Sequence, residues 1–600
     1  MREALQSGAL EHFSAPARSW FGRSFRAPTP AQEAAWSSIR SGDSTLVVAP
    51  TGSGKTLAAF FWALDVLAAR PVEAEPPKSS TVLYVSPLKA LAVDVERNLR
   101  APLTGLRQEM ARADLADPNI TVAVRSGDTP AAERRRQART PPDILITTPE
   151  SLYLLLTSAA RDGLRGVRTV IIDEIHSVAG SKRGAHLALS LERLEALTQA
   201  PVQRIGLSAT VRPAAEVARF LGGGRPVAVI EPSSDKEIDV RIEVPVEDMA
   251  DLGGSTAIET FEGSAAAEAP GNSIWPHVEQ RVLDLITAHT ATLVFVNSRR
   301  LAERLTSRLN ELALEREAEP PPDQPQVEYL PDFTSDGSHR SPPVVARAHH
   351  GSVSKEQRAS IEEDLKAGRL PAVVATSSLE LGIDMGAVDL VIQVEAPPSA
   401  AAGLQRIGRA GHQVGAVSRG SILPKYRADL MAATVVARLM RQRRIEALRV
   451  PENPLDVLAQ QVVAAVAVDD WHVDELFDLV RKAAPYARLP ESAWIATLDM
   501  LSGKYPADNF ADLRPKLVWD RVSGMLTARP GAQRLAVTSG GTIPDRGLFS
   551  VHLVGEKSSR LGELDEEMVY ESRVGDVFAL GANSWRIEDI THDRVVVSPA

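Results

Sequence analysis

A glycine-rich loop near the start of the chain carries the residue types that bind nucleotide phosphates. Residues 45–56 read TLVVAPTGSGKT, an apolar run followed by two glycines, a lysine and a threonine. Gly52 and Gly54 allow a tight turn whose backbone N–H groups can face phosphate oxygens. Lys55 can reach the β- and γ-phosphates, and the Thr56 hydroxyl can ligate Mg²⁺. We predict that the nucleotide is bound by Thr51, Gly52, Ser53, Gly54, Lys55 and Thr56.

Two adjacent carboxylates supply what this loop lacks for hydrolysis. Asp173 and Glu174 follow the apolar run in VIIDEIH, residues 170–176. Asp173 can hold Mg²⁺, directly or through water, and Glu174 can orient and deprotonate the attacking water. Two solvated acids at a strand end are the plain alternative, but this pair lies downstream of a phosphate loop. The combination predicts a hydrolysis site for ATP with Mg²⁺ or Mn²⁺.

The segments that must position these residues alternate between strands and helices. Apolar runs recur through residues 45–230 in TLVVA, TVLYVSP, DILITTP, TVIIDE and QRIGLSAT. A second series follows in ATLVFVNS, PVVARAHH, PAVVATSS and VDLVIQVEAP, without a second phosphate loop. Strands that alternate with helices favour parallel sheets, so an α/β chain with two similar units is expected. The polar stretch 231–276 is expected to include a connection, and the Pro-rich, acidic stretch 315–343 a surface loop.

The pattern changes after about residue 425, where helical stretches such as PLDVLAQQVVAAVA replace the alternation. Short strands with turns follow in RPKLVWDRVSGMLTARPGAQRLAV, and helices followed by a small hairpin suit a winged-helix module. From about residue 531 the segments are rich in strand-forming residues and continue to Ala600.

Composition excludes several classes of protein. The 600 residues contain 44% hydrophobic residues, which indicates a globular chain of several domains. There is no cysteine, so disulfides and thiolate catalysis are excluded and a cytoplasmic location, in a bacterial-type cytosol or nucleoid, is expected. No apolar run has membrane-spanning length, and we predict no membrane partner. The formal net charge of -10 gives no global basic field, so any nucleic-acid binding must use local patches.

Two further motifs of the first unit fit around the nucleotide. Gln32 ends TPAQ, and its amide can donate to and accept from an adenine edge, although an ordinary surface glutamine is the alternative. Ser208 and Thr210 belong to a strand-ending SAT motif. Their hydroxyls can bond to the DEIH segment and link it to a cleft, whereas helix capping is the alternative.

The second unit offers the remaining groups of a hydrolysis site. Gly382 and Asp384 of TSSLELGID could face the nucleotide. Gln405, Arg406 and Arg409 lie in GLQRIGRAGH at spacings that can place polar groups on one helix face. A guanidinium inserted into the cleft can stabilise the charge of the transferring phosphoryl group. A solvated basic helix is the alternative, which the surrounding glycines and interior strands disfavour.

Several polar residues at strand–helix junctions are candidates for contact with a nucleic-acid backbone. Hydroxyls, amides and helix N-termini suit sugar–phosphate contacts, and helix capping is an alternative that can hold at the same time. Trp519 and Trp585 stand next to basic residues and could stack on bases, but a tryptophan in a β-rich segment is more often part of a core. The predicted contacts are Ser86, Lys89, Thr148, Glu150, Ser298, Thr376, Ser377 and Trp585.

Taken in order, these motifs resemble those of superfamily-2 helicases. The series runs TPxQ, APTGSGKT, SPLKAL, TTPESL, DEIH, SAT, FVNS, HHGS, TSSLELGID and QRIGRAGH, and it covers roughly residues 25–415. The forms SPLKAL, DEIH, HHGS and QRIGRAGH, with a winged-helix-like region after them, are most similar to the large helicase-related (Lhr) family. The resemblance implies two tandem RecA-like parallel-sheet domains, a winged-helix domain and a β-rich fourth domain, which is expected to be truncated. The corresponding ranges are 1–230, 231–425, 426–530 and 531–600.

The resemblance also implies an activity and roles for individual residues. It implies ATP-driven 3′-to-5′ translocation on single-stranded DNA, with unwinding of duplexes in DNA repair. Lys55 and Thr56 then bind phosphate and Mg²⁺, Arg409 matches the arginine finger, and Gln405 and Arg406 line the cleft. The expected partners are single-stranded DNA and 3′-tailed duplexes, with RNA:DNA hybrid as a further candidate, and the oligomeric state stays open.

Two other functions remain open on sequence grounds. An RNA helicase or RNP remodeller would use the same motifs, because the contact that recognises a 2′-OH cannot be read from them. An ATP-switched binding scaffold without processive unwinding would also need the nucleotide site. A P-loop kinase or transporter ATPase, in contrast, does not explain the second unit with QRIGRAGH.

Overall fold

The structure is a computed structural model, and its first domain is built on a parallel sheet. All neighbouring strands are parallel, in the order β3-β4-β2-β5-β6-β1-β7. The strands are β1 (Thr45–Val48), β2 (Val82–Val85), β3 (Val122–Arg125), β4 (Ile144–Thr147), β5 (Thr169–Ile172), β6 (Gln203–Ser208) and β7 (Ala228–Ile230). The structure describes residues 8–50, 52–70, 78–198, 200–232, 237–249, 273–318, 344–351, 353–380, 386–411, 416–504, 514–545, 547–555, 560–580 and 583–600.

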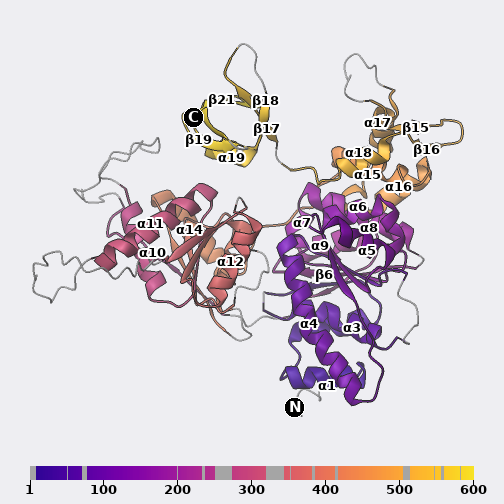
Figure 1. Ribbon diagram of the computed structural model, residues 1–600, viewed down its shortest axis with the longest axis horizontal. Helices are drawn as coiled ribbons and strands as arrows, with labels where there is room; N and C mark the ends of the chain where they lie inside the picture. Colours follow the sequence, from indigo (N-terminus) through magenta and orange to yellow (C-terminus); the bar gives the residue numbers. More distant parts are fainter. Residues whose placement is uncertain are drawn as a thin grey trace, which may run out of the picture. The chain divides into compact units, whose positions relative to one another are not determined.

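Helices connect these strands and cover the sheet (Figure 1). They are α1 (Ala15–Ser24), α2 (Pro30–Arg40), α3 (Lys55–Ala68), α4 (Lys89–Arg112), α5 (Ala131–Arg139), α6 (Pro149–Leu156), the 3₁₀ turn η2 (Ala159–Leu164), α7 (His176–Ala179), α8 (Lys182–Leu197) and α9 (Ala214–Gly222).

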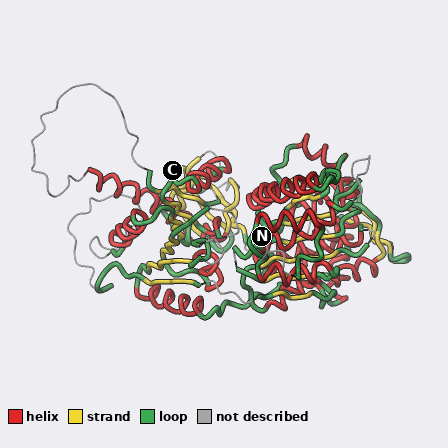
Figure 2. The backbone as a smooth tube through the Cα atoms, turned by 90° about the horizontal axis from the view of Figure 1, so that it is seen from below, coloured by secondary structure: helices red, strands yellow, loops and turns green. Residues whose placement is uncertain are grey.

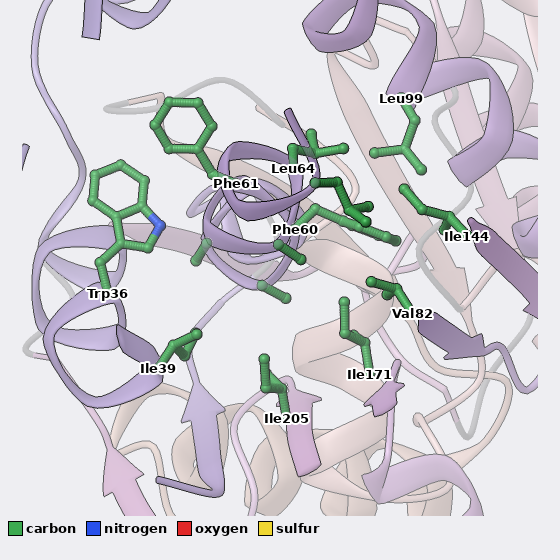
Figure 3. Packing of buried hydrophobic residues seen from close by; sticks show 14 of the residues in the cluster. Trp36, Ile39, Phe60, Phe61, Leu64, Val82, Leu99, Ile144, Ile171 and Ile205 are labelled. Carbon is green, nitrogen blue, oxygen red and sulfur yellow. The ribbon is translucent and has the colours of Figure 1, made fainter. Parts of the chain in front are cut away.

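The core of the first domain forms around α3, which follows the phosphate loop. Figure 3 shows Phe60 and Phe61 of this helix between Trp36 of α2 and sheet residues that include Ile171 and Ile205. All five side chains are buried, and complete burial of a large apolar side chain contributes about 1.5–3 kcal/mol. The helix that positions Lys55 and Thr56 is therefore fixed by packing along its whole length.

A second parallel sheet follows, with helices beside its strands (Figure 2). Its strand order is β10-β11-β9-β12-β13-β8, and every neighbouring pair is parallel. The strands are β8 (Ile238–Ile242), β9 (Thr292–Phe295), β10 (Ala346–His349), β11 (Ala372–Ala375), β12 (Leu390–Val394) and β13 (Ser418–Leu423). The helical elements are α10 (Trp275–Thr287), α11 (Arg299–Ala318), α12 (Lys355–Lys366), η3 (Ser377–Leu379), α13 (Ala400–Ile407) and α14 (Arg427–Arg441).

Strand β8 lies inside the polar stretch 231–276, where the sequence predicts a connection. It pairs with β13 at the edge of the second sheet, and its residues are half-buried or exposed rather than buried. An edge strand of this kind carries a weak apolar signal, which explains why the pattern misses it. Residues 233–236 and 250–272 of that stretch, and nearly all of 315–343, lie outside the described residues.

A winged-helix arrangement follows the second sheet. Its helices surround a small antiparallel sheet with the strand order β14-β16-β15. The elements are α15 (Leu455–Val466), β14 (Trp471–His472), α16 (Val473–Lys482), η4 (Ala484–Tyr486), α17 (Glu491–Ser502), β15 (Leu517–Trp519), β16 (Met525–Ala528) and α18 (Ala532–Thr538).

Residues 542–600 belong to a separate compact unit. It is a five-stranded sheet, in the order β18-β17-β21-β20-β19, with its own apolar core around Val551, Ile587 and Val595. The elements are β17 (Leu548–Leu553), β18 (Arg560–Asp565), α19 (Glu566–Glu571), β19 (Val577–Leu580), β20 (Asn583–Ile590) and β21 (Arg594–Pro599).

This architecture confirms the predicted fold class of two RecA-like parallel-sheet domains, a winged helix and a β-rich C-terminal segment. The domain boundaries drawn from the sequence stay predictions. Among the described residues, no helix combines the length and apolar character that crossing a bilayer requires.

Candidate active site

The phosphate loop leaves β1 and enters α3 through two glycines. Gly52 has φ +82° and Gly54 has φ +78°, a left-handed conformation that favours glycine. A Cβ on Gly54 would also lie 2.5 Å from the Gln32 amide nitrogen. The Ser53 hydroxyl donates to the Pro50 carbonyl at 2.7 Å, which holds the turn closed. Thr51 lies outside the described residues.

Lys55 begins α3 and directs its ammonium group back into the loop. Its Nζ donates to the carbonyl of Ala49 at 2.5 Å and lies 3.3 Å from that of Pro50. Burial lowers the pKa of Lys55, while the charges of Glu174 and Asp173 raise it. A phosphate bound in the loop would offer this cation charged oxygens in place of neutral carbonyls. Thr56 follows in the first turn of α3 and is half-buried.

Gln32 fixes the loop from the side. It is 4% exposed, so it is not the surface glutamine that the sequence leaves open. Its Oε1 accepts from the Thr29 backbone N–H at 3.0 Å, and its Nε2 donates to the Gly54 carbonyl at 3.3 Å. The Thr29 hydroxyl donates to the Ser53 carbonyl at 2.8 Å. Gln32 thus ties α2 to the phosphate loop, and its contact with adenine remains a prediction.

Asp173 and Glu174 lie at the end of β5, next to the loop, and both are buried. Asp173 accepts a hydrogen bond from the Tyr84 hydroxyl of the neighbouring strand β2 and another from the Glu174 backbone N–H at 2.9 Å. Burial and the charge of Glu174 raise the pKa of Asp173. Two adjacent buried carboxylates therefore favour a bound cation at this point.

Glu174 adopts a backbone conformation that is rare for its residue type. Its φ of +42° lies in the left-handed region, which costs about 1–3 kcal/mol for a residue other than glycine. Among the described residues, its Oε2 is buried and accepts no hydrogen bond. A strained carboxylate with an open acceptor is suited to take a proton from a water molecule.

The charges around Glu174 decide its protonation. Burial raises the pKa of Glu174, but His176, Lys55 and Arg409 lower it more. Because burial also lowers the pKa of His176, its imidazole is neutral at neutral pH. With His176 neutral, Lys55 and Arg409 are the remaining cations that lower the pKa of Glu174.

The residues present fit Mg²⁺ bound together with a nucleotide. Asp173 and the Thr56 hydroxyl would hold the ion, which would neutralise phosphate charge when bound. Among the described residues, no group of three or more His, Asp or Glu side chains forms a metal cage. Mg²⁺ would therefore complete its coordination with phosphate oxygens and water.

His176 links the first domain to the second. Its Nδ1 accepts from the Ala209 backbone N–H at 3.3 Å and lies 3.2 Å from the Ser208 hydroxyl. Its Nε2 lies 2.9 Å from the Gln405 amide nitrogen. A neutral imidazole that accepts at Nδ1 carries its proton on Nε2, so Gln405 must present its amide oxygen to this proton. The predicted link between the SAT motif and DEIH is present, and it extends to α13.

Arg409 approaches the same charges from the second domain. It is 3% exposed, and its Nη2 donates to the Glu380 carbonyl at 3.0 Å. Its charge interacts with those of Lys55 and Glu174. A cavity of about 200 Å³ lies between the loop residues Ala49 and Pro50 and the α13 residues Leu404 and Gln405. Groups from both sheets therefore surround one space.

Arg406 has a different environment from the other two residues of the motif. Its guanidinium group donates to Glu380 at 2.6 Å, and to Asn297 and Gln393 at 2.9 Å each. It also lies 5.4 Å above the Phe295 ring. These partners all belong to the second domain, so this arginine holds that domain together at the base of α13. Its predicted catalytic role is untested, and Gly382 and Asp384 lie outside the described residues.

The predicted strand contacts fall into two groups. Ser86 and Thr148 are buried, with their hydroxyls bonded to the Leu88 carbonyl at 3.0 Å and to Ser151 at 3.2 Å. Ser298 caps its helix by accepting from the Leu301 N–H at 3.2 Å. These three residues shape strand–helix junctions.

Other predicted strand contacts present side chains at the surface. Lys89 is exposed at the start of α4 and forms an ion pair with Asp128 at 2.7 Å. Glu150 pairs with Arg183 at 2.7 Å, and Thr376 and Ser377 are half-buried and exposed, respectively. Their contact with a strand remains a prediction.

Both tryptophans have protein partners. Trp585 packs beside the core of the C-terminal unit and donates to the Leu580 carbonyl at 3.3 Å. The Arg521 guanidinium group lies 3.3 Å from the centre of the Trp519 ring. Trp585 thus contributes to a core, as the structural alternative expects, and its stacking on bases is untested.

Two residues of the site make contacts that the sequence motifs do not indicate. Tyr84 lies on the strand next to β5, and His176 joins two domains; neither contact follows from spacing along the chain. The order of the strands would be needed to find the first, and the position of α13 to find the second.

Fold and site together define the class of protein, which is the superfamily-2 helicase core. Three family models match: DEAD/DEAH box helicase over residues 29–218, helicase conserved C-terminal domain over 326–413, and the winged helix domain of large helicase-related protein over 438–600. The solved structure of Mycobacterium smegmatis helicase Lhr bound to ssDNA and AMP-PNP is 58% identical, with a TM-score of 0.79. The match covers 96% of this chain and 68% of that chain.

The chain belongs to the large helicase-related (Lhr) family, as the sequence predicts. It is 62% identical over 598 residues to the Lhr helicase/probable uracil glycosylase of Mycolicibacterium smegmatis. It is 57% identical over 599 residues to the Lhr helicase/uracil glycosylase of Escherichia coli. Each match covers 98% of this chain, which spans 38% and 39% of the two relatives.

Proposed function

We propose that this chain is an ATP-driven nucleic-acid translocase that moves 3′-to-5′ on single-stranded DNA and unwinds DNA or RNA:DNA duplexes in DNA repair. One observation carries the proposal: residues of the phosphate loop and of α13, which belong to different domains, line one cavity, and His176 of DEIH lies 2.9 Å from the Gln405 amide of α13. A nucleotide bound there would contact both domains, so its hydrolysis would change how they are held together.

The chemistry divides among a few side chains. Lys55 and the loop N–H groups bind the phosphates, and Asp173 with Thr56 holds Mg²⁺. Glu174 accepts a proton from the attacking water through its open Oε2. Arg409 stabilises the charge that develops on the transferring phosphoryl group. After hydrolysis, Lys55 and Arg409 no longer share the γ-phosphate, and the domains can separate.

The imidazole of His176 gives the site a route for coupling. His176 follows Glu174 by two residues in the sequence. Its imidazole contacts Ser208 of the first domain and Gln405 of the second. A change in the distance between the domains would therefore reach the residues beside Glu174. If the two domains bind the strand tightly in turn as this distance changes, each round of ATP hydrolysis would move the protein along the strand.

The nature of the strand rests on the relatives. The Mycobacterium smegmatis structure contains ssDNA and an ATP analogue, and 68% of that chain corresponds to this one. This supports single-stranded DNA as the track. The direction of movement and the role in repair are proposed on the resemblance to the family alone.

A strand-displacement assay tests substrate and direction together. The protein is mixed with ATP, Mg²⁺ and duplexes that carry either a 3′ or a 5′ tail, made as DNA or as DNA:RNA hybrids. The proposal expects displacement from 3′-tailed DNA and little from 5′-tailed DNA. Displacement from the 5′ tail alone would refute the direction, and strand-stimulated hydrolysis without any displacement would favour an ATP-switched scaffold. An all-RNA duplex is included as well, and its preferred displacement would favour an RNA remodeller.

A further inference from the structure

A groove on the first domain lies apart from the ATP site. Helices α1 and α4 pack side by side (Figure 1). Their side chains line a hollow of about 630 Å³. The hollow shares no residue with the cavity at the phosphate loop. Trp20 lines the hollow and packs against α4 at Gly105. A Cβ on Gly105 would lie 2.1 Å from the indole ring. Glycine at this position lets the two helices approach closely.

A buried carboxylate holds two arginines at this groove. The Glu109 side chain is 6% exposed and pairs with Arg112 and, at 3.5 Å, with Arg23 of α1. The Ser19 hydroxyl also donates to Glu109, at 2.6 Å. This hydrogen bond, and then the two arginines, lower the pKa of Glu109, so the carboxylate stays charged and keeps both guanidinium groups in place.

The arginines retain most of their donors. A guanidinium group has five N–H donors, and Arg23 and Arg112 each contact Glu109 through Nη1 alone within the described part of the chain. Both side chains are about half exposed, at 51% and 54%. Glu109 therefore holds two guanidinium groups close together. This arrangement suits an anion with several oxygens, such as a phosphodiester.

A polar stripe on α4 continues the site along the groove. Arg100, Thr104, Gln108 and Arg112 follow each other at four-residue intervals, so each lies about 6 Å beyond the last. All four are exposed and line the hollow. Arg100 pairs with Glu96 at 3.1 Å, which reduces its net charge but leaves it at the rim. Hydroxyls, amides and guanidinium groups in a row suit a sugar–phosphate backbone.

We propose that this groove binds the phosphate backbone of nucleic acid outside the cleft between the domains. The row of polar side chains along α4 suits a polymer, and the residual positive charge stands out in a chain with a net charge of -10. The inference rests on the proposed function, because it assigns a second contact to the same nucleic acid. It would hold a flanking segment of the nucleic acid that lies outside the cleft between the two domains.

Binding of a tailed duplex at several salt concentrations tests the groove. Each phosphate contact contributes about 0.7 to the slope of log affinity against log salt for a single strand, and about 0.9 for a duplex. Arg112→Ala should lower this slope by about 0.7–0.9, and Arg23→Ala/Arg112→Ala by about twice as much. Arg107→Ala is the matched control, since Arg107 lies on the same helix, pairs with Asp117 at 3.3 Å and does not line the groove.

A second variant guards against misfolding. Removing both arginines leaves Glu109 buried without its charged partners, which can destabilise the domain. Thr104→Glu keeps these pairs and places a negative charge at the centre of the stripe. It should weaken binding of the tailed duplex about tenfold at low salt, because it repels the backbone. ATP turnover without nucleic acid should be unchanged in this variant.

The outcomes separate this inference from the proposed function. Equal slopes for Arg112→Ala and Arg107→Ala, with Thr104→Glu binding like wild type, would overturn the groove while wild-type binding still supports a translocase. A wild-type protein that binds no strand at all would overturn both. A lower slope in the groove variants, with the control unchanged, supports the second contact.

Discussion

The Nε2 atom of His176 lies 2.9 Å from the amide nitrogen of Gln405, which belongs to the other parallel-sheet domain. On its opposite side the same imidazole accepts from the Ala209 backbone N–H. One ring therefore connects the strand end that carries Glu174, the SAT motif and α13. In a nucleotide site that spans two domains, such a connection allows a change caused by hydrolysis to reach both domains.

Removing this connection should uncouple hydrolysis from the nucleic acid. In Gln405→Ala the two domains lose the contact through His176, whereas Lys55, Asp173 and Glu174 keep their surroundings. Basal ATP turnover should change little, but its stimulation by single-stranded DNA should fall about tenfold. Both rates are measured in one steady-state ATPase assay. Full stimulation in the variant would show that the contact is incidental.

Glu174→Gln should separate ATP binding from hydrolysis. The amide keeps the shape of the side chain but no longer accepts the proton of the attacking water. Turnover should fall about 10²- to 10⁴-fold, the usual contribution of a positioned base. Affinity for ATP, measured by equilibrium titration, should stay within a few-fold of wild type. A variant that hydrolyses ATP at the wild-type rate would remove Glu174 from the proposed role.

Tyr84→Phe should weaken the hold on Mg²⁺. The tyrosine hydroxyl donates to Asp173 and orients it, and groups that orient a metal ligand typically contribute 10- to 100-fold in affinity. The concentration of Mg²⁺ that gives half-maximal ATPase activity should therefore rise about tenfold. The ring itself stacks on Phe60 at 5.0 Å, so phenylalanine preserves the packing and the melting temperature should hardly change. An unchanged Mg²⁺ requirement would contradict the role.

Acid should weaken the first domain through His186. This residue is fully buried on α8, with its ring 4.8 Å from that of Tyr153, and neither ring nitrogen has a hydrogen-bond partner among the described residues. Burial lowers the pKa of His186 to about 4. The unfolded chain binds the proton near pH 6.5, so stability is complete above that value and is lost as the pH falls toward 4.

The loss can be measured against a variant that does not titrate. At about pH 5 the buried histidine should reduce the free energy of unfolding by about 2 kcal/mol relative to neutral pH. His186→Phe retains an aromatic ring at the site and removes this contribution. The melting temperature of wild type should therefore fall further between pH 7.5 and 5 than that of the variant. Parallel curves for the two proteins would contradict the assignment.

The sequence predicts the parts of the site that are local. The phosphate loop and DEIH are recognisable because a strand, a turn and the chemical groups occur within a few residues of each other. Nine strands of the two sheets are predictable for the same reason, since parallel strands such as β1 are short and mostly apolar. Edge strands β3, β7 and β8 are missed because their residues are only partly buried, and β13 is missed because its sequence SRGSIL is largely polar.

What sequence reasoning misses depends on contacts between distant segments. Tyr84 meets Asp173 because β2 lies beside β5, and His176 meets Gln405 because α13 reaches the first domain. The roles within QRIGRAGH also separate only in three dimensions. Arg406 is occupied by Glu380, Asn297 and Gln393, whereas Arg409 interacts with Glu174.

One ATP site is proposed to be completed by groups from both domains, and Arg409→Ala removes the group that the second domain is proposed to supply. ATP turnover is measured with saturating single-stranded DNA, and ATP affinity is measured separately. ATP turnover of Arg409→Ala should fall about 10³-fold or more while its ATP affinity changes far less, because the arginine acts on the transition state. Wild-type turnover in Arg409→Ala would contradict it, since the site in the first domain would then be sufficient on its own.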